Sequence, residues 1–137
     1  MKDGRPILLL EDDEIDVVAI KRALKELNIK NPLVVCENGA KGLEWLRANL
    51  QTPPAVILSD IDMPVMTGLE FLDKMKRDPD LQKIPVVILS TFREEPDRAK
   101  AFKLGVAGYM IKPIDAAKYH SIMKTIATYW QSSELPF

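Results

Sequence analysis

Five short apolar runs alternate with longer amphipathic stretches along this chain, and this alternation limits the fold more narrowly than any other feature of the sequence. Three of the runs are continuously apolar, which is typical of strands that are covered on both faces of a sheet. The runs predict strands at Ile7–Leu10, Leu33–Cys36, Ala55–Ser59, Val86–Ser90 and Ala107–Ile111.

The stretches between these runs repeat their apolar residues at the spacing of a helix. Residues 17–27, 40–50 and 119–130 carry apolar side chains three or four positions apart, and residues 68–77 and 96–104 are shorter and less regular. Alternating strands and helices predict an α/β fold with a doubly wound, five-stranded parallel sheet. Because crossovers are right-handed, the expected strand order is 2-1-3-4-5, as in flavodoxin-like (βα)5 folds.

Length and charge fit one domain over residues 1–137, with the last helix and a short tail from about residue 115. The net charge of -1 gives no field that would attract nucleic acid or an anionic membrane. The apolar runs are far shorter than the roughly 20 residues of a membrane span, and the N-terminus is too acidic for a secretory signal. The single cysteine, Cys36, permits no intrachain disulfide, which suits the cytoplasm.

Polar and charged residues follow four of the predicted strands. In a doubly wound sheet, ligands bind beyond the carboxyl ends of the strands, where the strand order reverses between the first and third strands. Both of these strands end in acids, so their carboxylates are expected to face each other, opposite a hydroxyl and an ammonium. The residues at the four strand ends are Glu11-Asp12-Asp13, Asp60-Ile61-Asp62, Ser90-Thr91 and Lys112-Pro113.

Carboxylates packed this closely repel one another, by about 4 kcal/mol for two unit charges about 4 Å apart at an effective dielectric of about 20. Lys112 alone cannot neutralise three acids, whereas Mg²⁺ takes oxygen ligands and needs only one or two carboxylates plus a phosphate. The pattern therefore predicts a magnesium site with one carboxylate left to react. That carboxylate can attack phosphorus and form an aspartyl phosphate, whose oxygens Ser90 and Lys112 would hold.

Each of these residues also has a purely structural interpretation. Acids after a strand often cap the next helix, and for Asp13 and Glu14 this interpretation weighs equally. The alternatives for Lys112 and Ser90 are a solvated surface lysine and an ordinary strand-end serine. The combination of four strand ends with complementary chemistry is what favours a site.

Four stretches carry a resemblance to a known family: ILLLEDDE, ILSDIDMPVMTGLEFL, PVVILST and GVAGYMIKP. Their order and spacing resemble the receiver domain of two-component response regulators over essentially the whole chain. The resemblance implies a cytoplasmic signalling protein that accepts a phosphoryl group from a partner histidine kinase in a reaction that depends on Mg²⁺. It implies no enzyme activity beyond the protein's own phosphorylation and dephosphorylation.

The resemblance also implies roles for individual residues. Asp60 is the implied phosphoacceptor, because it precedes Pro64 at the spacing of the family's motif. The implied metal ligands are Asp12 directly, Glu11 through water, Asp60 itself and the backbone carbonyl of Asp62.

The remaining implied roles concern the change of state on phosphorylation. Ser90 matches the family's switch serine or threonine, Lys112 matches its lysine, and Tyr109 matches the aromatic ring whose rotation accompanies the switch. The bond between Lys112 and Pro113 lies where the family often has a cis peptide.

The chain departs from the family at two positions. The family usually has Asp-Gly where this chain has Thr67-Gly68, and Thr67 and Glu70 have the spacing of a capping box that would start a helix at Thr67. Asp62 replaces the more usual amide or apolar residue and is expected to affect the lifetime of the phosphorylated state.

The stretches RPILLLEDDEIDVVAIKRAL, ILSTFREE and YWQSSELPF are similar to stand-alone receivers that partner bacterial phytochromes and related kinases. This narrower resemblance implies a homodimer through the fourth helix, the fifth strand and the fifth helix. Exposed aromatic residues at Phe102, Tyr119 and Tyr129 would fit such a face, and ordinary core packing is the alternative for them.

Two other functions fit parts of the pattern. Asp60 and Asp62 resemble the D-x-D pair of haloacid-dehalogenase-like phosphohydrolases, a nucleophile and a general acid, although that pair usually follows the first core strand. A receiver that docks to a partner without phosphorylation is the other alternative, but it would be expected to lack parts of the site. Turnover of a generic phosphate ester would identify the hydrolase.

Overall fold

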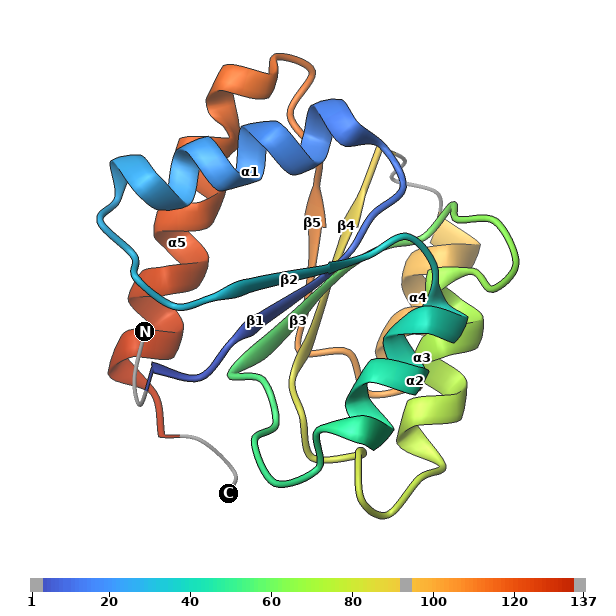
Figure 1. Cartoon of the computed structure of the whole chain (residues 1–137). Helices are drawn as coiled ribbons and strands as arrows, with labels where there is room; N and C mark the ends of the chain where they lie inside the picture. The colour runs from blue at the N-terminus through green and yellow to red at the C-terminus, as the bar shows by residue number, and fades with distance from the viewer. Residues whose placement is uncertain (1–3, 92–94, 135–137) are drawn as a thin grey trace.

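The computed structural model describes residues 4–91 and 95–134 and contains a five-stranded parallel sheet with the order β2-β1-β3-β4-β5 (Figure 1). This confirms the predicted doubly wound, flavodoxin-like fold. The strands are β1 (Ile7–Leu10), β2 (Leu33–Cys36), β3 (Val56–Asp60), β4 (Val86–Ser90) and β5 (Gly108–Ile111). The helices are α1 (Glu14–Glu26), α2 (Gly39–Ala48), α3 (Gly68–Lys76), α4 (Glu95–Lys103), the 3-10 helix η2 (Ala116–Lys118) and α5 (Tyr119–Ser132).

Helices cover both faces of the sheet. Figure 1 shows α1 and α5 on one face and α2, α3 and α4 on the other. The side chains of β1 alternate between the two layers: Ile7 and Leu9 belong to the core under α1 and α5, whereas Leu8 and Leu10 belong to the core under the other helices. This explains why the central strands are apolar throughout.

Two strands, β3 and β5, have boundaries that differ by one residue from those expected. β3 begins at Val56 rather than Ala55 and extends to Asp60, and β5 begins at Gly108 rather than Ala107. The extension matters for the site, because it makes Asp60 the last residue of a fully buried strand, paired in register with Leu89 of β4.

Side-chain caps fix the start of two helices near the carboxyl end of the sheet. Asp13 caps α1, since its Oδ1 accepts a hydrogen bond of 2.9 Å from the backbone N–H of Ile15. Thr67 and Glu70 form the predicted capping box at the start of α3. The structural interpretation of Asp13 is therefore confirmed.

Gly68 is required by a close approach of two backbone segments. A Cβ atom at this position would lie 2.0 Å from the carbonyl oxygen of Asp60. The N–H of Gly68 also donates to the carbonyl of Ile61 over 2.9 Å, which ties the first residue of α3 to the loop after β3. The identity of Gly68 thus holds the backbone around Asp60 in place.

Of the two interpretations of Tyr119, an exposed position on a dimer face is wrong and ordinary core packing is confirmed. Its side chain is fully buried, at 0% exposure, in the core between the sheet and the helices α1 and α5. The reason is that η2 precedes α5 and makes Tyr119 the first residue of that helix, on the face that also carries Met123. Phe102 and Tyr129 are exposed, at 55% and 60%.

Two further features of the described chain bear on the expectations. The peptide bond between Lys112 and Pro113 is trans, as are all the others in the described residues, in contrast to the cis bond often found in the family. Among the described residues, no helix combines the length and the apolar character that crossing a membrane requires.

Candidate functional site

The carboxyl ends of four strands bring the predicted site residues together. Glu11 directly follows β1, Asp60 ends β3, and Ser90 ends β4. Lys112 directly follows β5, and its backbone N–H donates to the carbonyl of Ser90 over 2.7 Å. Glu11, Asp60, Ser90 and Lys112 are all buried, so the site lies within the end of the sheet rather than on a loop surface.

The ammonium of Lys112 is the centre of this cluster. Its Nζ donates to both carboxylate oxygens of Glu11, at 3.0 and 3.1 Å, and lies 3.5 Å from Oδ1 of Asp60. The side chain of Lys112 is 6% exposed, which rules out the alternative of a solvated surface lysine. Buried charges of this kind persist only when they are paired and hydrogen-bonded.

Three carboxylates are close enough to share one cation. Each of Glu11, Asp12 and Asp60 offers an oxygen, and these three atoms all lie within 4.8 Å of one another. Glu11 and Asp60 are buried and Asp12 is exposed, so an ion would meet two oxygens inside the fold and one at its surface. Oxygen donors in this arrangement suit a hard divalent cation.

Asp62 is placed differently from the other acids. Its side chain is exposed and its carboxylate does not belong to this group of three. Burial is the main cause of the raised pKa of Asp60, and the negative charge of Asp62 adds to it. The ligand expected from this residue is its backbone carbonyl, and that role remains a prediction.

The site is electrostatically costly without a cation. Burial, with the charge of Asp60 as the second cause, raises the pKa of Glu11 to about 8. Burial also raises the pKa of Asp60. Burial lowers the pKa of Lys112, but the charges of Asp60 and Glu11 outweigh it and raise that pKa to about 12. One ammonium therefore does not compensate the surrounding acids, as expected from the sequence.

A fourth acid, Asp16 of α1, takes part in the cluster and was missed in the sequence. Its Oδ2 accepts from Nζ of Lys112 over 3.1 Å, and its Oδ1 accepts from the hydroxyl of Tyr119 over 3.0 Å. The signal that would have found it is its position four residues before Ile20 and seven before Ala23, which are buried. An acid on the apolar stripe of a helix needs a buried partner.

Ser90 and Tyr109 belong to the neighbouring strands β4 and β5. Ser90 is buried, whereas Tyr109 of β5 is half-buried and packs against the core under α2, α3 and α4. The rings of Tyr109 and Phe102 have centroids 6.5 Å apart, which links β5 to the exposed surface of α4.

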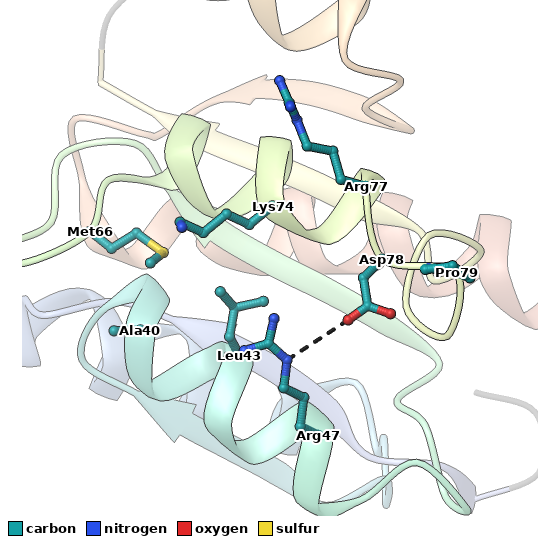
Figure 2. A pocket seen from close by; sticks show the side chains of 8 residues that line it. All are labelled: Ala40, Leu43, Arg47, Met66, Lys74, Arg77, Asp78 and Pro79. Atoms are coloured by element: carbon teal, nitrogen blue, oxygen red, sulfur yellow. Dashed lines mark ion pairs between the residues drawn. The ribbon is translucent and has the colours of Figure 1, made fainter.

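Two surface pockets differ in their relation to this cluster. A groove of about 420 Å³ borders Glu11 and Asp12 and gives solvent access to the acids. A larger pocket of about 570 Å³ lies between α2 and α3, where Arg47 faces Asp78 with an Nε–Oδ2 distance of 3.8 Å (Figure 2). None of the predicted site residues lines the larger pocket.

The fold and this cluster define a receiver domain, and the chain belongs to the response regulator receiver domain family, whose model matches residues 7–124. The phosphohydrolase and the phosphorylation-independent docking module are therefore not favoured. The family explains why acids, a hydroxyl and a lysine meet at the carboxyl end of this sheet.

Among individual relatives, the chain is similar to the response regulator Rcp1 of Synechocystis sp., with 30% identity over 128 residues that cover 90% of this chain and 87% of Rcp1. It is also similar to the solved structure of the phosphorylated cyanobacterial phytochrome response regulator RcpA, with 33% identity, a TM-score of 0.90, and coverage of 97% and 99%. The bacteriophytochrome response regulator AtBRR matches with 32% identity, a TM-score of 0.73, and coverage of 97% and 98%. These resemblances confirm the narrower one seen in the sequence.

A further solved relative bears on the metal. The chain matches the Mn²⁺-bound form of Rcp1 with 29% identity, a TM-score of 0.87, and coverage of 97% and 99%. The acids Glu11, Asp12 and Asp60 provide oxygen donors for a divalent ion in this chain.

Proposed function

We propose that this chain is a single-domain response regulator in which Asp60 accepts a phosphoryl group from a histidine kinase. The observation that carries the proposal is the convergence of Glu11, Asp12 and Asp60 within 4.8 Å, with the ammonium of Lys112 3.5 Å from Asp60. A carboxylate beside both a cation site and a fixed ammonium is equipped to react with phosphorus.

In the proposed reaction, one carboxylate oxygen of Asp60 forms a bond to phosphorus while the bond from phosphorus to the donor's histidine nitrogen breaks. Lys112 is placed to hold one phosphoryl oxygen, because its Nζ already lies within 3.5 Å of the reacting carboxylate. Glu11, Asp12, Asp60 and the backbone carbonyl of Asp62 would hold Mg²⁺. The bound ion would neutralise charge on the acids and on the phosphoryl oxygens.

The metal is proposed to be Mg²⁺ because the donors are all oxygens. Mg²⁺ keeps several waters and uses one or two carboxylates together with a phosphate, which fits a site that is buried on one side and open at Asp12. Mn²⁺, named for the solved form of Rcp1, takes similar ligands.

The phosphoryl group would act on the rest of the molecule through Ser90 and Tyr109. Ser90 ends β4 at the site, so its hydroxyl can donate to a phosphoryl oxygen on Asp60. Tyr109 lies opposite Ile88 in the sheet register, and its ring adjoins Phe102 on α4. A movement of Ser90 toward the phosphoryl group would leave space that the Tyr109 ring can occupy, and this would alter the α4–β5–α5 surface.

The partners follow from the same reasoning. The names of RcpA and AtBRR connect these relatives to phytochromes, which supports a phytochrome-type histidine kinase as the phosphodonor. Phe102 of α4 and Tyr129 of α5 are exposed and support a homodimer through α4, β5 and α5. Tyr119 takes no part in that surface because it is buried. On this account the protein catalyses only its own phosphorylation and dephosphorylation.

The proposal is tested by incubating the protein with Mg²⁺ and acetyl phosphate and weighing the intact chain. We expect one phosphoryl group per chain, no uptake when the metal is chelated, and no turnover of a generic phosphate ester. Sedimentation with and without beryllofluoride and Mg²⁺ then tests the dimer, and a monomer under both conditions would contradict it.

A further inference from the structure

We propose that Asp16 is a positioning residue for Lys112 and that Tyr119 fixes Asp16 in that role. This inference rests on the proposed function, because it concerns how the ammonium beside Asp60 is held for reaction. It joins α1 and the first residue of α5 to the site through a continuous line of hydrogen bonds.

The contacts of Lys112 show why a second anchor matters. The Nζ has three hydrogens, and Glu11 and Asp16 accept from it at 3.0 to 3.1 Å, whereas Asp60 is more distant at 3.5 Å. The three hydrogens of the ammonium are therefore taken by the two oxygens of Glu11 and by Oδ2 of Asp16, and these contacts hold the ammonium 3.5 Å from Asp60. An ammonium on a four-carbon stem has much rotamer freedom unless such contacts restrict it.

Glu11 cannot serve as the anchor by itself. Glu11 belongs to the group of acids that is suited to a divalent ion, so a bound ion would compete with Lys112 for its carboxylate oxygens. Asp16 lies outside the group formed by Glu11, Asp12 and Asp60, and its contact with Lys112 does not compete with that ion. The carboxylate of Asp16 therefore holds Lys112 in the metal-bound protein as well.

Asp16 also forms a close group with Glu11 and Asp13, which raises the alternative of a second metal site. The contacts argue against it. Asp13 already accepts a hydrogen bond as the cap of α1, and both oxygens of Asp16 accept hydrogen bonds, one from Lys112 and one from Tyr119. These acids are therefore engaged with protein donors.

Tyr119 completes the arrangement from the opposite side. Its ring is fully buried among the residues under α1 and α5, and its hydroxyl donates to Oδ1 of Asp16 over 3.0 Å. A buried ring has few positions available to it, so the hydroxyl sets the orientation of the Asp16 carboxylate. The second oxygen, Oδ2, is then directed at Lys112.

The test compares phosphorylation rate constants with acetyl phosphate at saturating Mg²⁺ and beryllofluoride affinities for a set of variants. Residues that hydrogen-bond to a metal ligand typically change affinity or activity by about tenfold or more when they are removed. By analogy, we expect Asp16→Ala to lower the rate constant and the beryllofluoride affinity by about tenfold. Asp16→Asn keeps an acceptor oxygen at this position, and Tyr119→Phe keeps the negative charge of Asp16. Both variants should therefore show a smaller fall in rate constant and beryllofluoride affinity than Asp16→Ala. Asp73→Ala removes a half-buried carboxylate of α3 that pairs with Arg77, the residue after that helix, and it should behave as the wild type.

Two double variants separate positioning from general damage. If Tyr119 acts through Asp16, Asp16→Ala combined with Tyr119→Phe should be no slower than Asp16→Ala alone. If Asp16 acts through Lys112, adding Asp16→Ala to Lys112→Met should not lower the phosphorylation rate constant further. Thermal unfolding of each variant identifies any that fail to fold, and Asp16→Asn then takes the place of Asp16→Ala.

The outcomes distinguish the two proposals. A wild-type phosphorylation rate constant in the folded Asp16 variants would overturn the positioning role. So would a double variant of Asp16→Ala and Lys112→Met whose rate constant falls by the product of the two single losses. Either result would leave the proposed function intact. A wild-type chain that takes up neither phosphoryl group nor beryllofluoride would overturn the proposed function itself.

Discussion

The ammonium of Lys112 lies 3.0 Å from Oε1 of Glu11, although 101 positions separate the two residues in the chain. They follow β5 and β1, which are not neighbours, because β3 and β4 lie between them in the sheet. The contact thus spans the carboxyl end of the sheet. Asp60, on the intervening strand β3, lies 3.5 Å from the same ammonium. The fold brings together an ion pair that no local segment could form.

Replacing Lys112 with methionine should destabilise the protein in the absence of metal. The substitution leaves Glu11, Asp16 and Asp60 without their shared counter-ion, and loss of one partner from a buried ion pair costs about 3 kcal/mol or more. Urea unfolding measures the loss, with Lys83→Met, at an exposed position, as the control. Equal midpoints for wild type and Lys112→Met would show that the pair contributes no net stability.

Magnesium should raise the melting temperature of the wild-type chain, because an ion that binds only the folded state stabilises it. Asp12→Asn should melt higher than wild type without metal, since one of three mutually repelling acids is gone, and should gain less from added Mg²⁺. Differential scanning calorimetry with and without a chelator measures both shifts. Glu44→Gln, which alters an exposed acid of α2, should respond to Mg²⁺ as the wild type does.

Gly68→Ala should impair both the fold and the site. The added Cβ would lie 2.0 Å from the carbonyl oxygen of Asp60, so either α3 or the end of β3 must move. We expect a loss of a few kcal/mol, in the range of overpacking, together with slower phosphorylation. Gly108→Ala is a control for the effect of an added methyl group, as its Cβ would lie at ordinary van der Waals distance, 3.6 Å from Cγ2 of Val87. Wild-type phosphorylation in a folded Gly68→Ala protein would contradict the structural link to Asp60.

Ser90→Ala should separate phosphorylation from its consequences. The variant keeps the acids and Lys112, so Asp60 should still accept the phosphoryl group, but the hydroxyl that would bind it is missing. We expect the phosphorylation-dependent change in sedimentation or kinase affinity to shrink severalfold, which corresponds to roughly 1 kcal/mol of lost hydrogen bonding. Thr91→Ala, at an exposed neighbouring position, is the matched control. A full response in Ser90→Ala would remove Ser90 from the switch.

The sequence was sufficient for the fold because strand and helix periods alternate without interruption. The sequence also predicted that the acids, the hydroxyl and the lysine lie at the carboxyl ends of the strands, since each of these residues directly ends or follows an apolar run. The geometry then agrees for Glu11, Asp12, Asp60 and Lys112.

The sequence was insufficient where a side chain's environment depends on how two helices pack. Asp16 resembles an ordinary first-turn acid of a helix, and only the packing of α1 against α5 brings it to Lys112 and Tyr119. For Tyr119 the sequence left an exposed position and core packing both open, and the turn made by η2, which makes Tyr119 the first residue of α5, decides for the core. Asp16 and Tyr119 meet in one contact between distant parts of the chain.

The most direct test of the central claim is the intact mass of wild type and Asp60→Asn after incubation with acetyl phosphate and Mg²⁺. Asp80→Asn, at an exposed acid outside the cluster, serves as the matched control. The account predicts one added phosphoryl group on the wild type and on Asp80→Asn, and none on Asp60→Asn. Equal uptake by Asp60→Asn and the wild type would contradict it.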